Sequence, residues 1–259
     1  MQYPKKDLLN DHMKKNNLIF DLGFHNGDDT DFYLRKGFNV VAVEADPRLV
    51  KKGITRFKSF INNKRLILIN RAVSDKTGVE KFYINLKRSD WSSCNKALAE
   101  SDGSRSKVVS VESITLNKLC DDFGTPRYVK VDVEGKDVAV ARQLYELKDR
   151  PQYISFETSR QTYAGLFSWL YISGYNKFQL VNQLNNHFRK MGDYSKSGEG
   201  KKINYKFSKY SSGFFGKDLP SDGWLSYDDA LTRYLKYKEL KVIDNKELAI
   251  GWLDLHASL

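Results

Sequence analysis

Short apolar runs alternate with amphipathic stretches along the first two thirds of the chain. The runs are rich in β-branched and aromatic residues and predict buried strands at 18–22, 40–44, 66–70, 127–133, 152–157 and 178–181. Between them, apolar residues recur with a helical period, which predicts helices at 28–36, 48–60, 114–122, 136–147 and 160–173. This alternation is typical of an α/β fold with a doubly wound, mostly parallel sheet and right-handed crossovers.

The pattern of apolar and polar residues changes between residues 79 and 111. Residues 79–86 alternate apolar and polar side chains, and residues 107–111 form a second extended piece. The polar, serine-rich segment 87–105 lies between them. We therefore expect an antiparallel insertion with a long loop at its tip, and loops of this length within a compact domain are usually functional or disordered.

The two ends of the chain differ from this pattern. Residues 5–15 predict a short polar helix before the first strand, and residues 225–237 and 247–255 predict helices near the end. We expect one α/β domain over residues 1–181, with the insertion at about 79–111. We interpret residues 182–259 as an edge strand and a substrate-facing extension of the same domain.

The first predicted strand leads into a glycine-containing turn. Asp21 stands at its end, and Gly23 and Gly27 flank a turn that contains His25, in the spacing D-x-G-x-x-x-G. Glycines at such positions let the backbone turn tightly and let a ligand approach the main chain. Glu44 ends the second strand, where a carboxylate can accept hydrogen bonds from both hydroxyls of a ribose. This order is the first half of a nucleotide-binding α/β fold.

The spacing of the glycines indicates which nucleotide fits. A dinucleotide-binding turn has the pattern G-x-G-x-x-G, which supports a pyrophosphate, and this chain lacks it. A ligand without phosphates is therefore favoured. S-adenosylmethionine has a ribose, an adenine and a charged amino-acid tail. In this interpretation Asp21 and Gly27 flank the methionine part and Glu44 holds the ribose. The glycine pattern alone also occurs by chance, so the inference depends on its strand–turn–helix–strand context.

Composition narrows the class of protein. The chain has 259 residues, of which 41% are hydrophobic and 13% aromatic, enough for a sizeable core. It contains no apolar run of about 18 residues, so no membrane-spanning helix is expected. The first residues lack the hydrophobic centre of a secretory signal. Cys94 and Cys120 form neither a C-x-x-C pair nor a zinc spacing, which favours a reduced, cytoplasmic setting.

The net charge of +11 leaves nucleic acid as an alternative partner. The lysines are spread singly or in pairs, however, so a nucleic-acid partner is not our expectation. In an RNA methyltransferase, Trp91, Tyr205 and Tyr210 would be candidates to stack on bases. The N-P-P-Y/F motif of enzymes that methylate base amino groups is absent. G-x-S-x-G, H-E-x-x-H and a Walker lysine are also absent, so hydrolase and kinase functions lack support.

A second group of candidate residues is acidic. Asp132 and Glu134 end the fourth predicted strand, and Glu157 ends the fifth. In open α/β sheets, ligands bind beyond the carboxyl ends of the strands, so these three carboxylates are candidate general bases. Each has an alternative role as a cap of the following helix. Carboxylates at strand ends can also hold Mg²⁺, although no histidine cluster supports a metal site.

Three segments resemble the FkbM-type S-adenosylmethionine-dependent methyltransferases. They are IFDLGFHNGDDT, VVAVEADP and ITLNKLCDDFGTPRYVKVDVEGKD. The family pattern has strands ending in D-x-G-x-N-x-G, E-P-x-P and K-I-D-V-E-G, and the last is the most specific. The chain departs from it at His25, where the family usually has Asn, and at Ala45, where proline usually follows the glutamate.

The resemblance implies a class I methyltransferase fold, S-adenosylmethionine as the cofactor and, in many members, methylation of a hydroxyl of a sugar or secondary metabolite. Carried over by position, it implies a cofactor site lined by Asp21, Gly23, His25, Gly27, Glu44, Ala45, Ala72 and Asp132. Asp132 and Glu134 would lie near the transferred methyl group. The acceptor would be a small molecule or a glycan. An RNA methyltransferase and a catalytically inactive cofactor-binding module stay open as alternatives, and the oligomeric state is not indicated.

Overall fold

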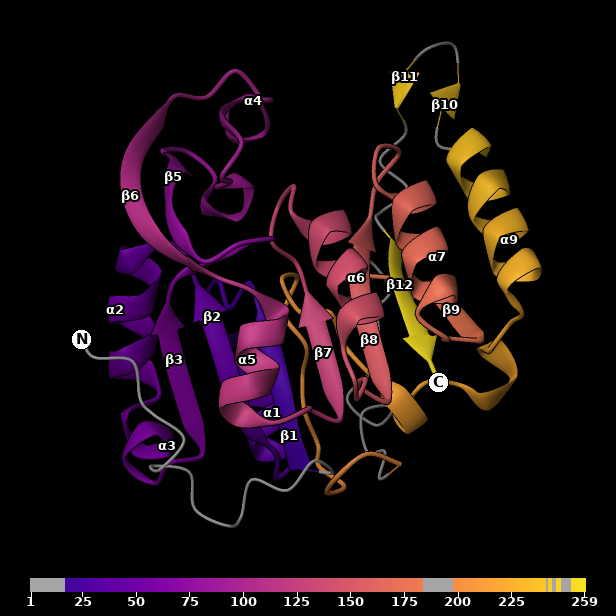
Figure 1. Cartoon of the computed structure of the whole chain (residues 1–259), viewed down its shortest axis with the longest axis horizontal. Coiled ribbons are helices and arrows are strands. Elements are labelled where there is room, and N and C mark those ends of the chain that lie inside the picture. Colours follow the sequence, from indigo (N-terminus) through magenta and orange to yellow (C-terminus); the bar gives the residue numbers. More distant parts are fainter. Residues whose placement is uncertain (1–16, 184–197, 241, 244–245, 248–252) are drawn as a thin grey trace.

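A seven-stranded sheet forms the centre of the molecule (Figure 1). The computed structural model describes residues 17–183, 198–240, 242–243, 246–247 and 253–259, so the helix predicted at 5–15 lies outside the described residues. The strand order is β3-β2-β1-β7-β8-β12-β9. The strands are β1 (Leu18–Leu22), β2 (Asn39–Glu44), β3 (Leu66–Asn70), β7 (Tyr128–Val131), β8 (Tyr153–Thr158), β9 (Lys177–Asn182) and β12 (Leu253–Ser258).

The strands from β3 to β8 run parallel, as predicted. Phe20 of β1 aligns with Val41 of β2 on one side and with Val129 of β7 on the other. All three side chains are buried, because helices and connecting segments cover both faces of the sheet. Parallel pairing brings the carboxyl ends of these strands to one edge, and the arrangement is the predicted doubly wound, Rossmann-like α/β fold.

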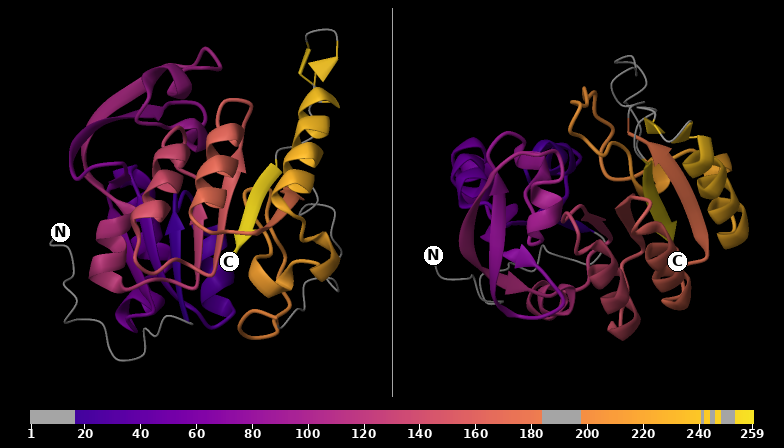
Figure 2. Two further views of the ribbon diagram at one scale, coloured as in Figure 1. Left: turned by 45° about the vertical axis from the view of Figure 1, so that its right-hand side comes forward. Right: turned by 90° about the horizontal axis from the view of Figure 1, so that it is seen from above.

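Helices cover the two faces unequally (Figures 1 and 2). One face packs against α5 (Leu116–Phe123), α6 (Asp137–Glu146), α7 (Tyr163–Ile172) and α9 (Tyr227–Leu240). The other packs against α1 (Asp28–Arg35), with α2 (Pro47–Arg56) and α3 (Lys58–Asn62) toward the β3 end. The single helix predicted at 48–60 is divided at Phe57, whose buried ring packs edge-on against Phe24.

An insertion rises above the carboxyl ends of β1, β2 and β3 (Figure 1). It is a three-stranded sheet of β4 (Ala72–Val73), β6 (Ser106–Ile114) and β5 (Gly78–Asn85), in that order. The antiparallel pairing of β5 with β6 confirms the predicted insertion, whereas β4 pairs with β6 in parallel. The connection carries η3 (Ser89–Trp91) and α4 (Lys96–Ala99).

The last strand does not lie where the sequence led us to expect it. β12 pairs antiparallel with both β8 and β9, so it is an internal strand and β9 forms the edge. The helix predicted at 247–255 is wrong at Leu253–Leu255, which belong to β12. All six residues of β12 are buried, because β12 is an internal strand and both faces of the sheet are covered. Before it, β10 (Val242–Ile243) and β11 (Lys246–Glu247) form a short antiparallel pair.

An extended segment, residues 198–223, covers part of the α1 face. Phe215 stacks on Tyr128 of β7 with ring centroids 4.4 Å apart. A fully buried ion pair joins Lys36 to Asp218 at 2.6 Å. The segment includes η5 (Gly216–Asp218) and η6 (Ser221–Gly223). Among the described residues, none of the helices has the length and apolar character needed to cross a membrane.

Candidate active site

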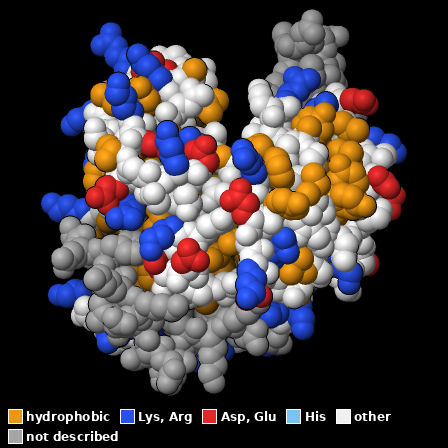
Figure 3. All heavy atoms as spheres, viewed as in Figure 1, with side chains coloured by type: hydrophobic (Ala, Val, Ile, Leu, Met, Phe, Trp, Pro, Cys, Tyr) orange, Lys and Arg blue, Asp and Glu red, His pale blue; other side chains and the backbone are white. Residues whose placement is uncertain are grey.

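A cavity of about 730 Å³ lies at the carboxyl edge of the parallel strands. Its walls come from the glycine turn after β1, the end of β2, the insertion, the ends of β7 and β8, and residues 183 and 209–210. At this edge the space-filling view shows a deep notch between the insertion and the side of the molecule that carries α9 (Figure 3). The location agrees with the rule that open α/β sheets bind ligands beyond their carboxyl ends.

Most residues predicted to hold the cofactor line this cavity. They are Gly23, His25, Glu44, Ala45, Ala72 and Asp132. Asp21 and Gly27 are not among the lining residues. Asp21 is fully buried below the turn and accepts a 2.6 Å hydrogen bond from the Thr30 hydroxyl. Gly27 is packed against the rings of Phe24 and Phe57. Asp21 therefore lies beneath the turn, and Gly27 closes it, since its amide donates a 2.8 Å hydrogen bond to the Phe24 carbonyl.

Two segments of the backbone lie so close together at Gly23 that a side chain would not fit. Its φ of +96° lies in the left-handed region, and a Cβ atom there would be 1.9 Å from the carbonyl oxygen of Asp132. Its amide donates a 3.0 Å hydrogen bond to the carbonyl of Val43. Glycine at this position therefore allows the ends of β1, β2 and β7 to lie close together.

Two backbone amides fix the Glu44 carboxylate. One oxygen accepts from the amide of His25 at 2.7 Å and the other from the amide of Asp46 at 2.8 Å. Burial raises the pKa of Glu44 to about 7, against the opposing effect of these amides. Each oxygen keeps a further lone pair for a ligand hydroxyl. Ala72 and Phe82 form an apolar wall of the same cavity, so a ribose with an attached purine fits this part of the site.

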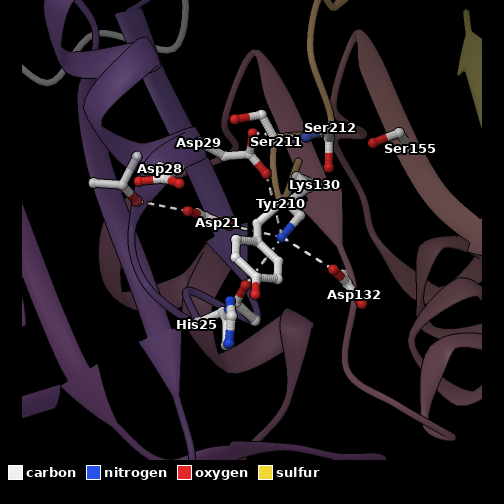
Figure 4. Close-up of polar contacts among 12 residues, drawn as sticks. Asp21, His25, Asp28, Asp29, Lys130, Asp132, Ser155, Tyr210, Ser211 and Ser212 are labelled. Carbon is white, nitrogen blue, oxygen red and sulfur yellow. Dashed lines mark hydrogen bonds and ion pairs between the residues drawn. The ribbon is translucent and has the colours of Figure 1, made fainter. Parts of the chain in front are cut away.

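Lys130 lies at the centre of the site and was not among the predicted site residues (Figure 4). Its ammonium donates a 3.0 Å hydrogen bond to the Gly23 carbonyl. It lies 3.4 Å from a carboxylate oxygen of Asp132 and 3.6 Å from oxygens of Asp21 and Asp29. Burial lowers the pKa of Lys130, but these carboxylates outweigh burial and hold that pKa well above its usual range. A lysine inside the apolar run of β7 was the sequence signal for a buried ion pair.

The three predicted carboxylates meet in the cavity, since Asp132, Glu134 and Glu157 all line it. Burial raises the pKa of Glu134 to about 8, and the neighbouring charges of Asp132 and Asp137 add to this effect. Burial also raises the pKa of Glu157 well above its usual range. Glu134 has a φ of +45°, an uncommon conformation for a residue with a side chain, which is often found at functional sites.

The helix-capping roles considered for Glu134 and Glu157 are wrong, because α6 and α7 begin without a side-chain cap. Asp137 accepts hydrogen bonds from the amides of Val133 and Gly135 at the start of α6. Ser159 and Thr162 exchange side-chain and backbone hydrogen bonds before α7. Neither helix has a side-chain cap from Glu134 or Glu157. Within the described ranges, no group of three or more His, Cys, Asp or Glu side chains is arranged to hold a metal ion.

His25 joins three distant segments at the cavity. Its ring nitrogen Nε2 lies 3.1 Å from the Ser89 hydroxyl of the insertion. Its ring meets the edge of Tyr210, with centroids 5.4 Å apart. Burial, followed by the nearby charge of Lys130, lowers the pKa of His25, so the ring is neutral at physiological pH. These contacts could not be predicted from local sequence patterns, because the partners are far apart along the chain.

Comparison with known proteins agrees with this geometry. Residues 21–193 match the family described as the methyltransferase FkbM domain. No match was found among curated proteins. Two solved structures are similar only in part. A SAM-dependent O-methyltransferase from Thermotoga maritima is 9% identical, with 98% of this chain and 62% of that chain covered at a TM-score of 0.40. A precorrin-6y C5,15-methyltransferase from Geobacter metallireducens GS-15 is 15% identical, with coverage of 64% and 67% and a TM-score of 0.35.

These superpositions are too loose to assign a substrate, but the family match spans most of the chain, from the glycine turn to the end of the parallel strands. It contains both the turn that carries His25 and the K-V-D-V-E-G segment that carries Lys130 and Glu134. The chain therefore belongs to the FkbM methyltransferase family and uses S-adenosyl-L-methionine as its cofactor.

Proposed function

We propose that this methyltransferase transfers a methyl group to a hydroxyl oxygen of a sugar, a glycan or a secondary metabolite, with a carboxylate as the base. The observation that carries the proposal is the position and pKa of Glu134. Its carboxyl group lines the cavity next to Asp132, and its pKa of about 8 lies near physiological pH. A general base is most effective when its pKa is close to the working pH.

The chemistry of the residues that line the cavity fits S-adenosylmethionine. Glu44 offers fixed oxygens for the ribose hydroxyls, and Ala72 and Phe82 would face the adenine. The cofactor supplies an electrophilic methyl group on a sulfonium, which is a cation. Asp132 and Glu134 line the cavity just beyond the end of β7, where their carboxyl oxygens would stabilise a cation.

When bound, the cofactor would supply a methyl group for transfer to the acceptor oxygen, with a neutral thioether as the leaving group. The Glu134 carboxylate would accept the hydroxyl proton as the new bond between oxygen and carbon forms. The enzyme contributes mainly the alignment of oxygen, carbon and sulfur.

Asp132 and Glu157 are the other candidates for the base. Asp132 lies 3.4 Å from the Lys130 ammonium, so its carboxylate is already engaged in an ion pair. Glu157 is flanked in the sheet by Asp254, its partner in register on β12. We therefore assign the proton transfer to Glu134 and the charge near the methyl group to Asp132.

Binding and turnover test the proposal separately. Calorimetry with S-adenosylmethionine should show binding to the purified protein. A panel of hydroxylated sugars and glycans, with products analysed by mass spectrometry, should then show an added methyl group on oxygen. Methylation only on nitrogen or carbon would overturn the proposed O-methylation. Binding with no turnover on any acceptor would favour the inactive module.

RNA is the weaker candidate substrate. Tyr205, one of the aromatics considered for base stacking, packs against Phe32 and donates its hydroxyl to Asp28 and Asp31. It is therefore part of the packing on α1. We retain the cytoplasm as the proposed location, since Cys94 and Cys120 are both free thiols.

A further inference from the structure

The lining of the cavity contains both carboxyl groups and cations. The wall formed by the ends of β7 and β8 carries Asp132, Glu134 and Glu157. Another part of the lining, contributed by the insertion and by residues 209–210, carries cations and aromatic rings, together with Asp90. We call this second region, formed by Lys87, Arg88, Trp91, Lys209 and Tyr210, the basic mouth.

Two cation–aromatic pairs make up the basic mouth. The Arg88 guanidinium lies 4.1 Å from the centroid of the Trp91 ring, and the Lys209 ammonium lies 4.7 Å from that of Tyr210. His25 connects the two sides, because its ring contacts both Ser89, next to Arg88, and Tyr210. The pairs therefore come from segments more than a hundred residues apart and meet around one histidine.

The charges of the mouth are only partly balanced. Arg88 forms an ion pair with Asp90 at 2.7 Å. Lys87 and Lys209 are exposed, and within the described residues neither has a carboxylate oxygen within ion-pair distance. Tyr210 is 46% exposed although it lines the cavity. An exposed aromatic ring beside unbalanced cations is suited to a ligand that is both cyclic and anionic.

We propose that the methyl acceptor is a hydroxylated ring compound that carries an anionic group, such as a carboxylate or a phosphate, and that Lys87 and Lys209 bind this group. The inference rests on the proposed O-methylation. Lys87 and Lys209 attract the anionic group to the mouth, while the hydroxyl faces Glu134. The ring lies between Trp91 and Tyr210. The cations of the basic mouth thus orient the acceptor.

Matched acceptors test the proposal. Binding to the protein saturated with S-adenosylhomocysteine would be measured by calorimetry for methyl glucuronide against methyl glucoside, and for glucose 6-phosphate against glucose. We expect at least one anion to bind about tenfold or more tightly than its neutral partner, a difference of about 1.4 kcal/mol. The preference should shrink as salt is raised, because the lysines are exposed. The two pairs distinguish a carboxylate from a phosphate.

Two double variants test which lysines cause the preference for the anionic acceptor. The double variant Lys87→Gln/Lys209→Gln should lose the preference for the anion. Lys81→Gln/Lys206→Gln is the matched control, since both lysines are exposed on the same two segments and neither lines the cavity. Binding of S-adenosylmethionine should be equal in both, which reports separately on the cofactor site.

Three results would overturn the proposal. One is equal affinity for anionic and neutral partners, or no binding of either anion. Another is an equal loss in the control variant. The third is tight binding of an oligoribonucleotide that depends on Lys87 and Lys209, which would favour RNA as the substrate. Failure of S-adenosylmethionine to bind would instead contradict the assigned cofactor.

Discussion

The Lys130 ammonium lies 3.4 Å from a carboxylate oxygen of Asp132, two residues further along the same segment (Figure 4). The same ammonium lies 3.6 Å from Asp21 and from Asp29 and donates a hydrogen bond to Gly23. One buried cation therefore connects β7, the glycine turn and the start of α1. It also neutralises carboxylates that would otherwise repel one another.

Removing this cation should destabilise the protein. In Lys130→Met the buried carboxylates lose their counter-charge, and we expect the free energy of unfolding to fall by about 3–5 kcal/mol. Urea unfolding at neutral pH measures the change. Lys118→Met is the control, because its ion pair with Asp122 is on the surface of α5 and should contribute about 0.5 kcal/mol or less. Equal effects of the two substitutions would contradict the central role of Lys130.

Replacing Glu134 should slow the chemical step. In Glu134→Gln we expect turnover to fall by about 10²–10⁴-fold, because the hydroxyl proton has no acceptor. The affinity for S-adenosylmethionine, measured by calorimetry, should change little. In the unmodified enzyme the rate should rise as the pH passes through about 8, the pKa of Glu134, since only the ionised carboxylate accepts a proton. A Glu134→Gln enzyme with normal turnover would assign the base elsewhere.

The stability of the unliganded protein should decrease as pH rises. Folding raises the pKa of Glu44 to about 7 and that of Glu134 to about 8, from an ordinary value of 4.5. The folded state therefore binds protons that the unfolded state has released. This contribution is fully present below about pH 4.5 and is lost as pH rises through the folded pKa values of these groups.

Urea unfolding at pH 5, 7 and 9 and constant ionic strength measures this dependence. Glu134→Gln should reduce the slope, because glutamine stays neutral throughout. A slope identical to that of the unmodified protein would show that Glu134 does not hold its proton in the folded state.

Replacing Glu44 should weaken cofactor binding. Glu44→Ala removes the two fixed oxygens proposed to accept the ribose hydroxyls, and hydrogen bonds to a charged group contribute about 1.5–3 kcal/mol. We expect an increase in Kd of about tenfold or more for S-adenosylmethionine. Glu239→Ala, an exposed position on α9, is the control. If both variants bind the cofactor equally well, Glu44 does not contact it.

Gly23→Ala should disrupt the meeting point of the strands. The new Cβ would lie 1.9 Å from the carbonyl oxygen of Asp132, so β1 and β7 would have to separate. Gly124→Ala is the matched control, because its φ is also in the left-handed region, at +85°, but no atom lies within 4 Å of the added Cβ. Thermal unfolding should show a larger loss for Gly23→Ala, together with weaker cofactor binding. Similar losses would assign the effect to backbone strain alone.

The parallel core could be predicted from sequence because its information is local. Leu18–Leu22 and Leu66–Asn70 are apolar runs short enough to be strands, and both were predicted at their observed limits. The insertion was visible in the alternation of residues 79–86, most of which form β5. β12 was not predicted. It pairs with β8 and β9, which lie far away along the chain, and the residues near β12 do not indicate this pairing.

The sequence by itself determined the alternating α/β pattern, the glycine turn, and the carboxylates that end the strands, since each is encoded by neighbouring residues. Only the tertiary structure decided what these groups do together. It buried Asp21 below the turn, placed Lys130 among three carboxylates and brought Tyr210 against His25. Such relationships depend on distance in space and on exclusion of water, and neither property can be read along the chain.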